Sequence, residues 1–124
     1  ATEAGCEPVV GQMPMNAAGR ALTLDDPEGF VRVVADGETE FVLGAQIVAP
    51  EASELVAEFA LAIEMGAQLE DVASTVHTHP TLSEAVMEAA ESRIGSSAKG
   101  SPGSSIGRLP VATMQCSNAT VSAP

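Results

Sequence analysis

Residues 30–37, Phe-Val-Arg-Val-Val-Ala-Asp-Gly, decide the fold of this chain. The first six alternate in the manner of a β-strand that buries one of its faces. The Asp-Gly pair that follows is a strong short-range signal for a hairpin turn. Residues 40–48 are nearly all apolar, which is typical of a central strand, and Gly44 within them indicates a bulge. We therefore predict an antiparallel strand pair that turns around Asp36 and Gly37.

The sequence on either side of this hairpin predicts one further strand and three helices. Residues 9–15 are extended, and Pro14 cannot donate to a ladder, so we expect an edge strand. A helix begins at Pro50 or Glu51 and ends at Gly66, because apolar residues recur between them at three- and four-residue spacing. Its apolar stripe comprises Leu55, Val56, Phe59, Ala60 and Ile63. Shorter helices over residues 69–76 and 81–90 complete an α+β fold, an antiparallel sheet with helices packed on one face.

Composition and charge restrict the class of protein. The chain has 124 residues, which suits one domain, and it is 45% hydrophobic but only 2% aromatic. Small and branched aliphatic side chains must therefore fill its core. The formal net charge of −12, from 17 acidic and 5 basic residues, excludes nucleic acid as a partner, because phosphate binding needs clustered Lys and Arg. The dispersed acidic residues resemble the surface of proteins from a high-salt cytoplasm, and an ordinary acidic mesophilic domain would fit the same charge equally well.

Cysteine usage and apolar runs indicate the compartment. Cys6 and Cys116 are far apart and form neither a metal-binding cluster nor a Cys-x-x-Cys redox pair. We expect both to be reduced, in a cytoplasmic protein without a metal site. No apolar run approaches the roughly 18 residues of a membrane span, and no signal peptide is visible. The chain has no initiator Met, so we expect it to begin inside a longer polypeptide.

The composition changes sharply after Glu91. No acidic residue follows it, and residues 92–124 combine three basic residues with abundant Ser, Gly, Pro and Ala. Such a segment buries too little apolar area to offset the entropy of ordering it. We therefore predict a domain over residues 1–91 and a disordered or non-native tail over residues 92–124.

The stretch His-Thr-His-Pro-Thr-Leu-Ser-Glu, residues 77–84, contains both histidines of the chain. Glu84 lies five residues after His79, and a carboxylate beside an imidazole can fix the tautomer of the ring and raise its basicity. The same residues allow a second interpretation. Thr81 and Glu84 have the spacing of a capping box, with Thr81 at the N-cap of a helix. The residues alone leave both interpretations open.

This stretch resembles the C-terminal signature of the dihydrolipoamide dehydrogenases, which are flavin-dependent pyridine nucleotide–disulfide oxidoreductases. Other segments resemble the interface domain of that family in the same order, namely residues 29–33, 43–48, 52–56 and 60–67. Because several segments agree in order and spacing, the resemblance is specific. It extends from about Val9 to Glu91.

The resemblance implies a homodimer contact and half of an active site. His79 would be the acid–base at the active site of the other subunit, and Glu84 would orient it. His79 and Pro80 would lie near the FAD of that subunit, with a cis peptide between them, whereas His77 would be a structural histidine. A full-length enzyme of this family uses FAD and NAD and acts on the lipoyl domain of 2-oxo acid dehydrogenase complexes.

The chain also departs from the family. It has no cysteine pair five positions apart and no Gly-x-Gly-x-x-Gly fingerprint, so we expect it to bind no cofactor and to be inactive alone. Its tail could derive from vector sequence or a shifted reading frame. One alternative is a stand-alone dimerisation module without catalysis. Another is the same domain from a glutathione-reductase-like relative, although the His-x-His opening and residues 82–85 look more like the lipoamide enzyme.

Overall fold

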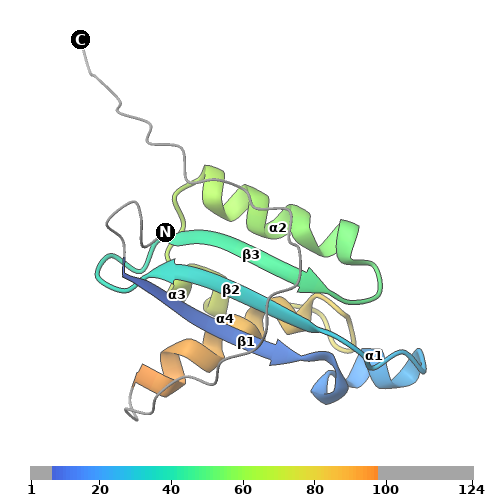
Figure 1. Ribbon diagram of the computed structural model, residues 1–124. Helices are drawn as coiled ribbons and strands as arrows, with labels where there is room; N and C mark the ends of the chain where they lie inside the picture. The colour runs from blue at the N-terminus through green and yellow to red at the C-terminus, as the bar shows by residue number, and fades with distance from the viewer. Residues whose placement is uncertain (1–6, 98–124) are drawn as a thin grey trace.

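The computed structural model describes residues 7–97 and contains a three-stranded antiparallel sheet with helices packed against it (Figure 1). In chain order the elements are β1 (Pro8–Pro14), the 3-10 helix η2 (Met15–Ala17), α1 (Gly19–Thr23), β2 (Phe30–Asp36), β3 (Val42–Val48), α2 (Ala52–Glu64), α3 (Leu69–Ser74) and α4 (Glu84–Ser97). This arrangement confirms the predicted α+β class. The predictions for Cys6, for Cys116 and for the tail beyond Ser97 lie outside the described residues.

The sheet has the order β1-β2-β3, so β2 is its central strand. The prediction that residues 40–48 form the central strand is therefore wrong. β3 is apolar although it lies at an edge, because α2 packs along it (Figure 1). The register of β2 against β3 shifts between Val34, opposite Gly44, and Ala35, opposite Val42, which places the bulge at the predicted position. The fully buried side chains of β2 are Val31, Val33 and Ala35.

The connection between β2 and β3 is a loop over residues 37–41, longer than a two-residue turn. The backbone oxygen of Asp36 accepts the N–H of Glu40 at 2.9 Å, and Glu40 has a φ of 60°. The left-handed residue is thus Glu40 and not the glycine. Gly37 is required for close approach: its N–H donates to the backbone oxygen of Glu7 at 2.7 Å, and an added Cβ would lie 2.9 Å from that oxygen.

The ends of helix α2 were predicted more accurately than the residues of its apolar face. It begins after Glu51, whose φ of 56° is left-handed, and it stops before Gly66, whose φ is 65°. The glycine stop is therefore confirmed. Leu55 and Phe59 are buried, but Val56 is half exposed and does not belong to the apolar face.

Helices α3 and α4 both differ from the prediction at their ends. α3 stops at Ser74 because the next residue is extended, and Val76, predicted inside this helix, is 91% exposed. α4 begins at Glu84 instead of Thr81 and continues past the predicted domain boundary at Glu91. The division of the chain into a domain and a tail stays a prediction. The helix α4, however, extends to Ser97, so residues 92–97 are helical although the prediction assigns them to the tail.

The core lies between the sheet and the helices and consists almost entirely of small and branched aliphatic side chains. Phe59 is its one aromatic member among the described residues, whereas Phe41 is 44% exposed. This confirms the composition that the sequence predicted. The core comprises Met15, Ala18, Ala21, Val31, Val33, Ala35, Val42, Phe59, Leu69, Val72, Ala85, Val86, Ala89 and Ala90.

The edge strand β1 is held by α4. An added Cβ on Gly11 would lie 2.1 Å from the backbone oxygen of Ala89, so strand and helix backbones meet there without a side chain between them. One residue further along, the N–H of Gln12 donates to the Ser92 hydroxyl of α4 at 2.9 Å. β1 therefore has a partner on its outer side as well as β2 on its inner side.

Candidate functional site

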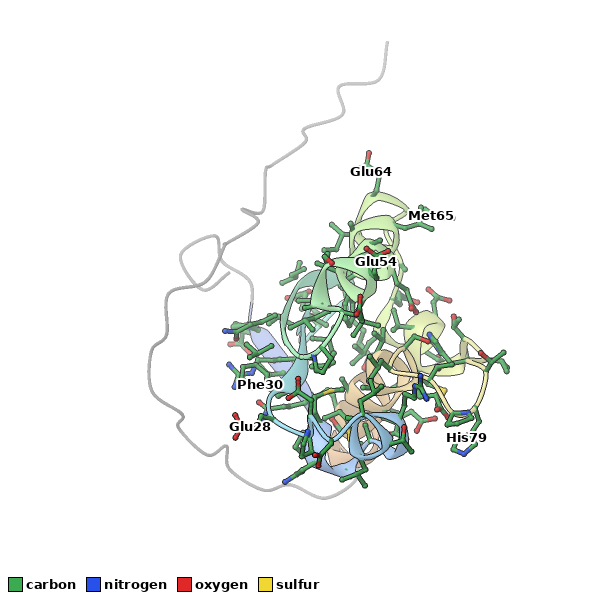
Figure 2. All side chains as sticks on the ribbon, turned by 90° about the vertical axis from the view of Figure 1, so that its right-hand side faces the viewer. Glu28, Phe30, Glu54, Glu64, Met65 and His79 are labelled. Carbon is green, nitrogen blue, oxygen red and sulfur yellow. The ribbon has the colours of Figure 1, made fainter. Side chains whose placement is uncertain are left out.

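The segment between α3 and α4, residues 75–83, carries both histidines and has no regular secondary structure. Pro80 lacks an N–H and cannot continue a helix, which keeps α3 and α4 apart. The His79–Pro80 peptide is cis, as the family resemblance implies. His79 lies at the outer surface of this segment, and its side chain is 77% exposed (Figure 2).

Glu84, the first residue of α4, binds two parts of this segment through its two carboxylate oxygens. Oε1 lies 2.8 Å from Nδ1 of His79, and Oε2 accepts the backbone N–H of Thr81 at 2.8 Å. One side chain thus forms both the His–carboxylate pair and the carboxylate half of the capping box. The second half of the box, in which the Thr81 hydroxyl would accept the N–H of Glu84, is not formed, and this hydroxyl donates instead to the backbone oxygen of Thr78 at 2.7 Å.

These contacts determine where the proton of the His79 ring lies. A carboxylate can only accept a hydrogen bond, so Nδ1 of His79 carries the hydrogen and Nε2 presents its lone pair. The Thr81 N–H and the His79 ring hold the pKa of Glu84 below its usual range, which keeps that carboxylate charged. Glu84 is also the more enclosed partner, with 19% of its side chain exposed. The result is an oriented imidazole whose second nitrogen faces outward from its carboxylate.

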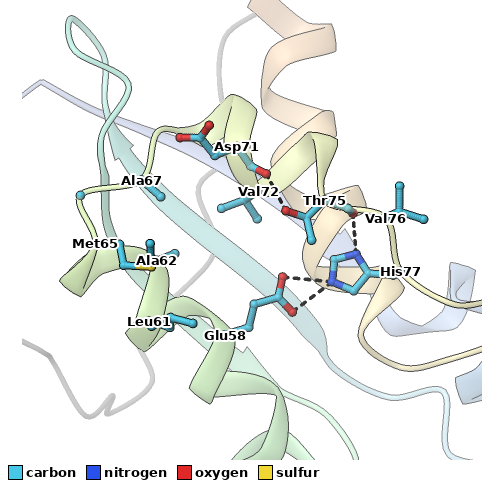
Figure 3. Close-up of a pocket in the computed structure, with 11 residues that line it drawn as sticks. Glu58, Leu61, Ala62, Met65, Ala67, Asp71, Val72, Thr75, Val76 and His77 are labelled. Atoms are coloured by element: carbon cyan, nitrogen blue, oxygen red, sulfur yellow. Dashed lines mark hydrogen bonds and ion pairs between the residues drawn. The ribbon is translucent and has the colours of Figure 1, made fainter.

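His77 lies in quite different surroundings, although it is only two residues away. Its side chain is 7% exposed, and it lines a pocket of about 590 Å³ between α2 and α3 (Figure 3). Nδ1 lies 2.8 Å from the backbone oxygen of Thr75, and Nε2 lies 3.0 Å from each carboxylate oxygen of Glu58. The sequence did not indicate Glu58. No local signal in the sequence distinguishes it from Glu54 and Glu64 on the same helix.

Within residues 7–97, no cluster of three His, Cys, Asp or Glu side chains could hold a metal ion. No helix in this part of the chain is both long and apolar enough to cross a membrane.

Fold and site together define an α+β interface domain that presents an oriented imidazole at its surface. A family model for the dimerisation domain of pyridine nucleotide-disulphide oxidoreductases matches residues 1–90. The chain therefore belongs to this family.

Several of the similar proteins are dihydrolipoyl dehydrogenases. The chain is 75% identical to a dihydrolipoyl dehydrogenase of Haloferax volcanii over 95 residues, which are 77% of this chain and 20% of that protein. It is 70% identical over 95 residues to dihydrolipoyl dehydrogenase 2 of Haloarcula marismortui, with the same coverage. Among solved structures, LpdA of Mycobacterium tuberculosis has a TM-score of 0.68 at 29% identity, over 73% of this chain and 20% of that chain.

These comparisons confirm the resemblance to the dihydrolipoamide dehydrogenases that the sequence indicated. The relatives are oxidoreductases, and the family model that matches this chain describes the dimerisation domain of such enzymes. The chain spans about a fifth of the length of these relatives.

Proposed function

We propose that this chain is the dimerisation domain of a dihydrolipoyl dehydrogenase and supplies the pair His79–Glu84 to the active site of the partner subunit. There, dihydrolipoamide would be oxidised and NAD reduced. One observation carries this proposal: the His79 ring is fixed by Glu84 through Nδ1, at 2.8 Å, while its side chain is 77% exposed. A base that serves a neighbouring subunit needs both properties.

The two residues divide the work of a general base. Nε2 of His79 accepts the proton of a dihydrolipoamide thiol, and the thiolate so formed is the species that attacks a disulfide. Glu84 holds the ring in the tautomer with a free Nε2 and stabilises the imidazolium once the proton has arrived. FAD, NAD and a redox-active disulfide supply the electron transfer in such an enzyme. Pro80, next to His79, would form part of the surface that approaches the flavin.

The partners and the compartment follow from the same proposal. The chain would pair with a second copy, and the complete enzyme would act on the lipoyl domain of a cytoplasmic 2-oxo acid dehydrogenase complex. The sequence contains neither a Gly-x-Gly-x-x-Gly fingerprint nor a redox cysteine pair. The isolated chain would therefore bind no FAD and have no dehydrogenase activity.

The experiment uses a chimeric holoenzyme in which the 95-residue matching segment of this chain replaces its counterpart in the Haloferax volcanii enzyme. Replacing His79→Gln should lower the oxidation of dihydrolipoamide by about 10²–10⁴-fold, the usual contribution of a general acid–base. Electron transfer from NADH to an artificial dye through the flavin should stay within about twofold, because it needs no thiol deprotonation.

Two outcomes would contradict the proposal. If the His79→Gln chimera oxidised dihydrolipoamide normally, the domain would act as a dimerisation module without catalysis. If the variant also lost the dye reaction, the substitution would have damaged flavin binding or assembly. Flavin absorbance that co-purifies in a 1:1 ratio with the isolated chain would refute the expected absence of a cofactor.

A further inference from the structure

His77 differs from His79 in that both of its ring nitrogens face a hydrogen-bond acceptor. The backbone oxygen of Thr75 lies 2.8 Å from Nδ1, and the carboxylate of Glu58 lies 3.0 Å from Nε2 (Figure 3). A carbonyl and a carboxylate cannot donate, and a neutral imidazole has a single N–H. Both contacts exist together only if a second proton lies between His77 and Glu58. The geometry is that of an imidazolium paired with a carboxylate.

This pair attaches the part of the segment that precedes His79, whereas Glu84 holds His79 and Thr81 from the other side. Of residues 75–80, only His77 is not exposed, and Val76 is 91% exposed. No apolar side chain of these six residues therefore anchors the segment to the fold. The side chain of His77 instead reaches Glu58 on α2, 19 residues earlier in the chain. Removing the pair would leave the segment held mainly at its two ends.

Glu84 orients the His79 ring, but the backbone on the N-terminal side of His79 depends on the Glu58–His77 pair. At one end the Thr75 hydroxyl donates to the backbone oxygen of Asp71, and at the other the Thr81 hydroxyl donates to that of Thr78. Between them, His77 and His79 are separated by one residue, a span of at most about 7 Å. A shift of the His77 backbone by 1 Å would therefore be passed on almost undiminished to His79.

We propose that Glu58 and His77 form a positioning pair for His79: their ion pair locks the segment to α2 and so sets where His79 meets the partner subunit. This inference rests on the proposed function. His77 is not itself the base, because neither of its nitrogens is free. Loss of the pair should lower kcat for dihydrolipoamide oxidation by about 10–100-fold, the effect expected when a catalytic group is misplaced by about 1 Å.

The test compares Glu58→Ala and Glu58→Gln in the same chimeric holoenzyme. Glu58→Ala removes the pair and should lower kcat for dihydrolipoamide, with KM and NADH-to-dye transfer within about twofold. Glu58→Gln should recover most of the lost rate. Its amide can donate to Nε2 of a neutral His77, whose Nδ1–H still donates to Thr75. The matched control is Glu64→Ala on the same helix, because the Glu64 side chain is exposed and points away from the site (Figure 2).

The outcomes separate this inference from the proposed function. If His79→Gln abolishes dihydrolipoamide oxidation but Glu58→Ala behaves like Glu64→Ala, the positioning pair is refuted and the base is retained. If His79→Gln has no effect, the proposed function fails first. If Glu58→Gln is as slow as Glu58→Ala, the pair does not act through the contact described.

A second measurement keeps the inference testable should Glu58→Ala fail to fold. The unaltered chain, labelled with ¹⁵N-histidine, should give one imidazole with hydrogens on both nitrogens when the pair is formed, and Glu58→Gln should convert it to the Nδ1–H tautomer. A neutral His77 ring in the unaltered chain would overturn the assignment.

Discussion

Replacing Gly11→Ala tests the claim that β1 and α4 meet backbone to backbone. The added Cβ would lie 2.1 Å from the Ala89 oxygen, whereas ordinary contact begins at 3.4 Å. About 1.3 Å of movement is needed, and the obstacle is helix backbone, not the end of a flexible side chain. Overpacking of this kind typically costs about 1–3 kcal/mol. We expect a cost near the upper end of this range. Replacing a strand glycine gains about 0.5–1 kcal/mol, so the net loss of unfolding free energy should be about 2 kcal/mol.

The assay is thermal unfolding of the chain, with Gly44→Ala as the matched control. Gly44 also lies in a strand, but a Cβ built on it meets nothing within 4 Å. A loss of about 2 kcal/mol should lower the Tm of Gly11→Ala by about 8–16 °C, while Gly44→Ala should be unchanged or raised by a few degrees. Hydrogen exchange at the Gln12 amide should also accelerate in Gly11→Ala as α4 moves away with Ser92. Equal Tm values for the two variants would refute the close contact.

Two further predictions concern charge. Burial and the carboxylates of Glu84 and Glu91 raise the pKa of Glu88, so its ionised form is less favourable in the folded state. That cost is absent below the ordinary value of 4.5 and grows as the pH rises through the folded value. Glu88→Gln should therefore raise the Tm at pH 7 by up to about 4 °C and leave it unchanged at about pH 3, and equal shifts at both pH values would contradict this. Because the net charge is −12, the Tm of the chain should also rise between about 0.1 M and about 2 M KCl as salt screens the repulsion, and a fall would count against an acidic surface adapted to high salt.

Local signals in the sequence predicted most of the fold. The alternation in residues 30–35 corresponds to the alternating burial of β2, and Gly66 ends α2 with the left-handed φ expected of it. The strand order was not predicted correctly. An unbroken apolar strand can be buried by neighbouring strands or by a helix, and β3 is covered by α2. Nothing within residues 40–48 distinguishes these two possibilities.

The candidate site was predictable where its partners are close in sequence. His79 and Glu84 are five residues apart, and the structure places them in hydrogen-bonding contact. Glu58 and His77 are 19 residues apart, and their contact exists only because α2 and the segment after α3 come together in the fold. A charge on a helix is usually solvated, so nothing in the sequence selects Glu58 from its neighbours.

The attachment of β1 to α4 has a consequence for contacts between molecules. An edge strand with free N–H groups is a template on which another chain can add a strand. In β1 every second residue, from 8 to 14, directs its backbone N–H position outward. Two of these four residues are Pro8 and Pro14, which have no N–H. The Ser92 hydroxyl occupies a third, that of Gln12. Only Val10 is left to offer an outward donor, so this edge is a poor nucleus for fibre growth.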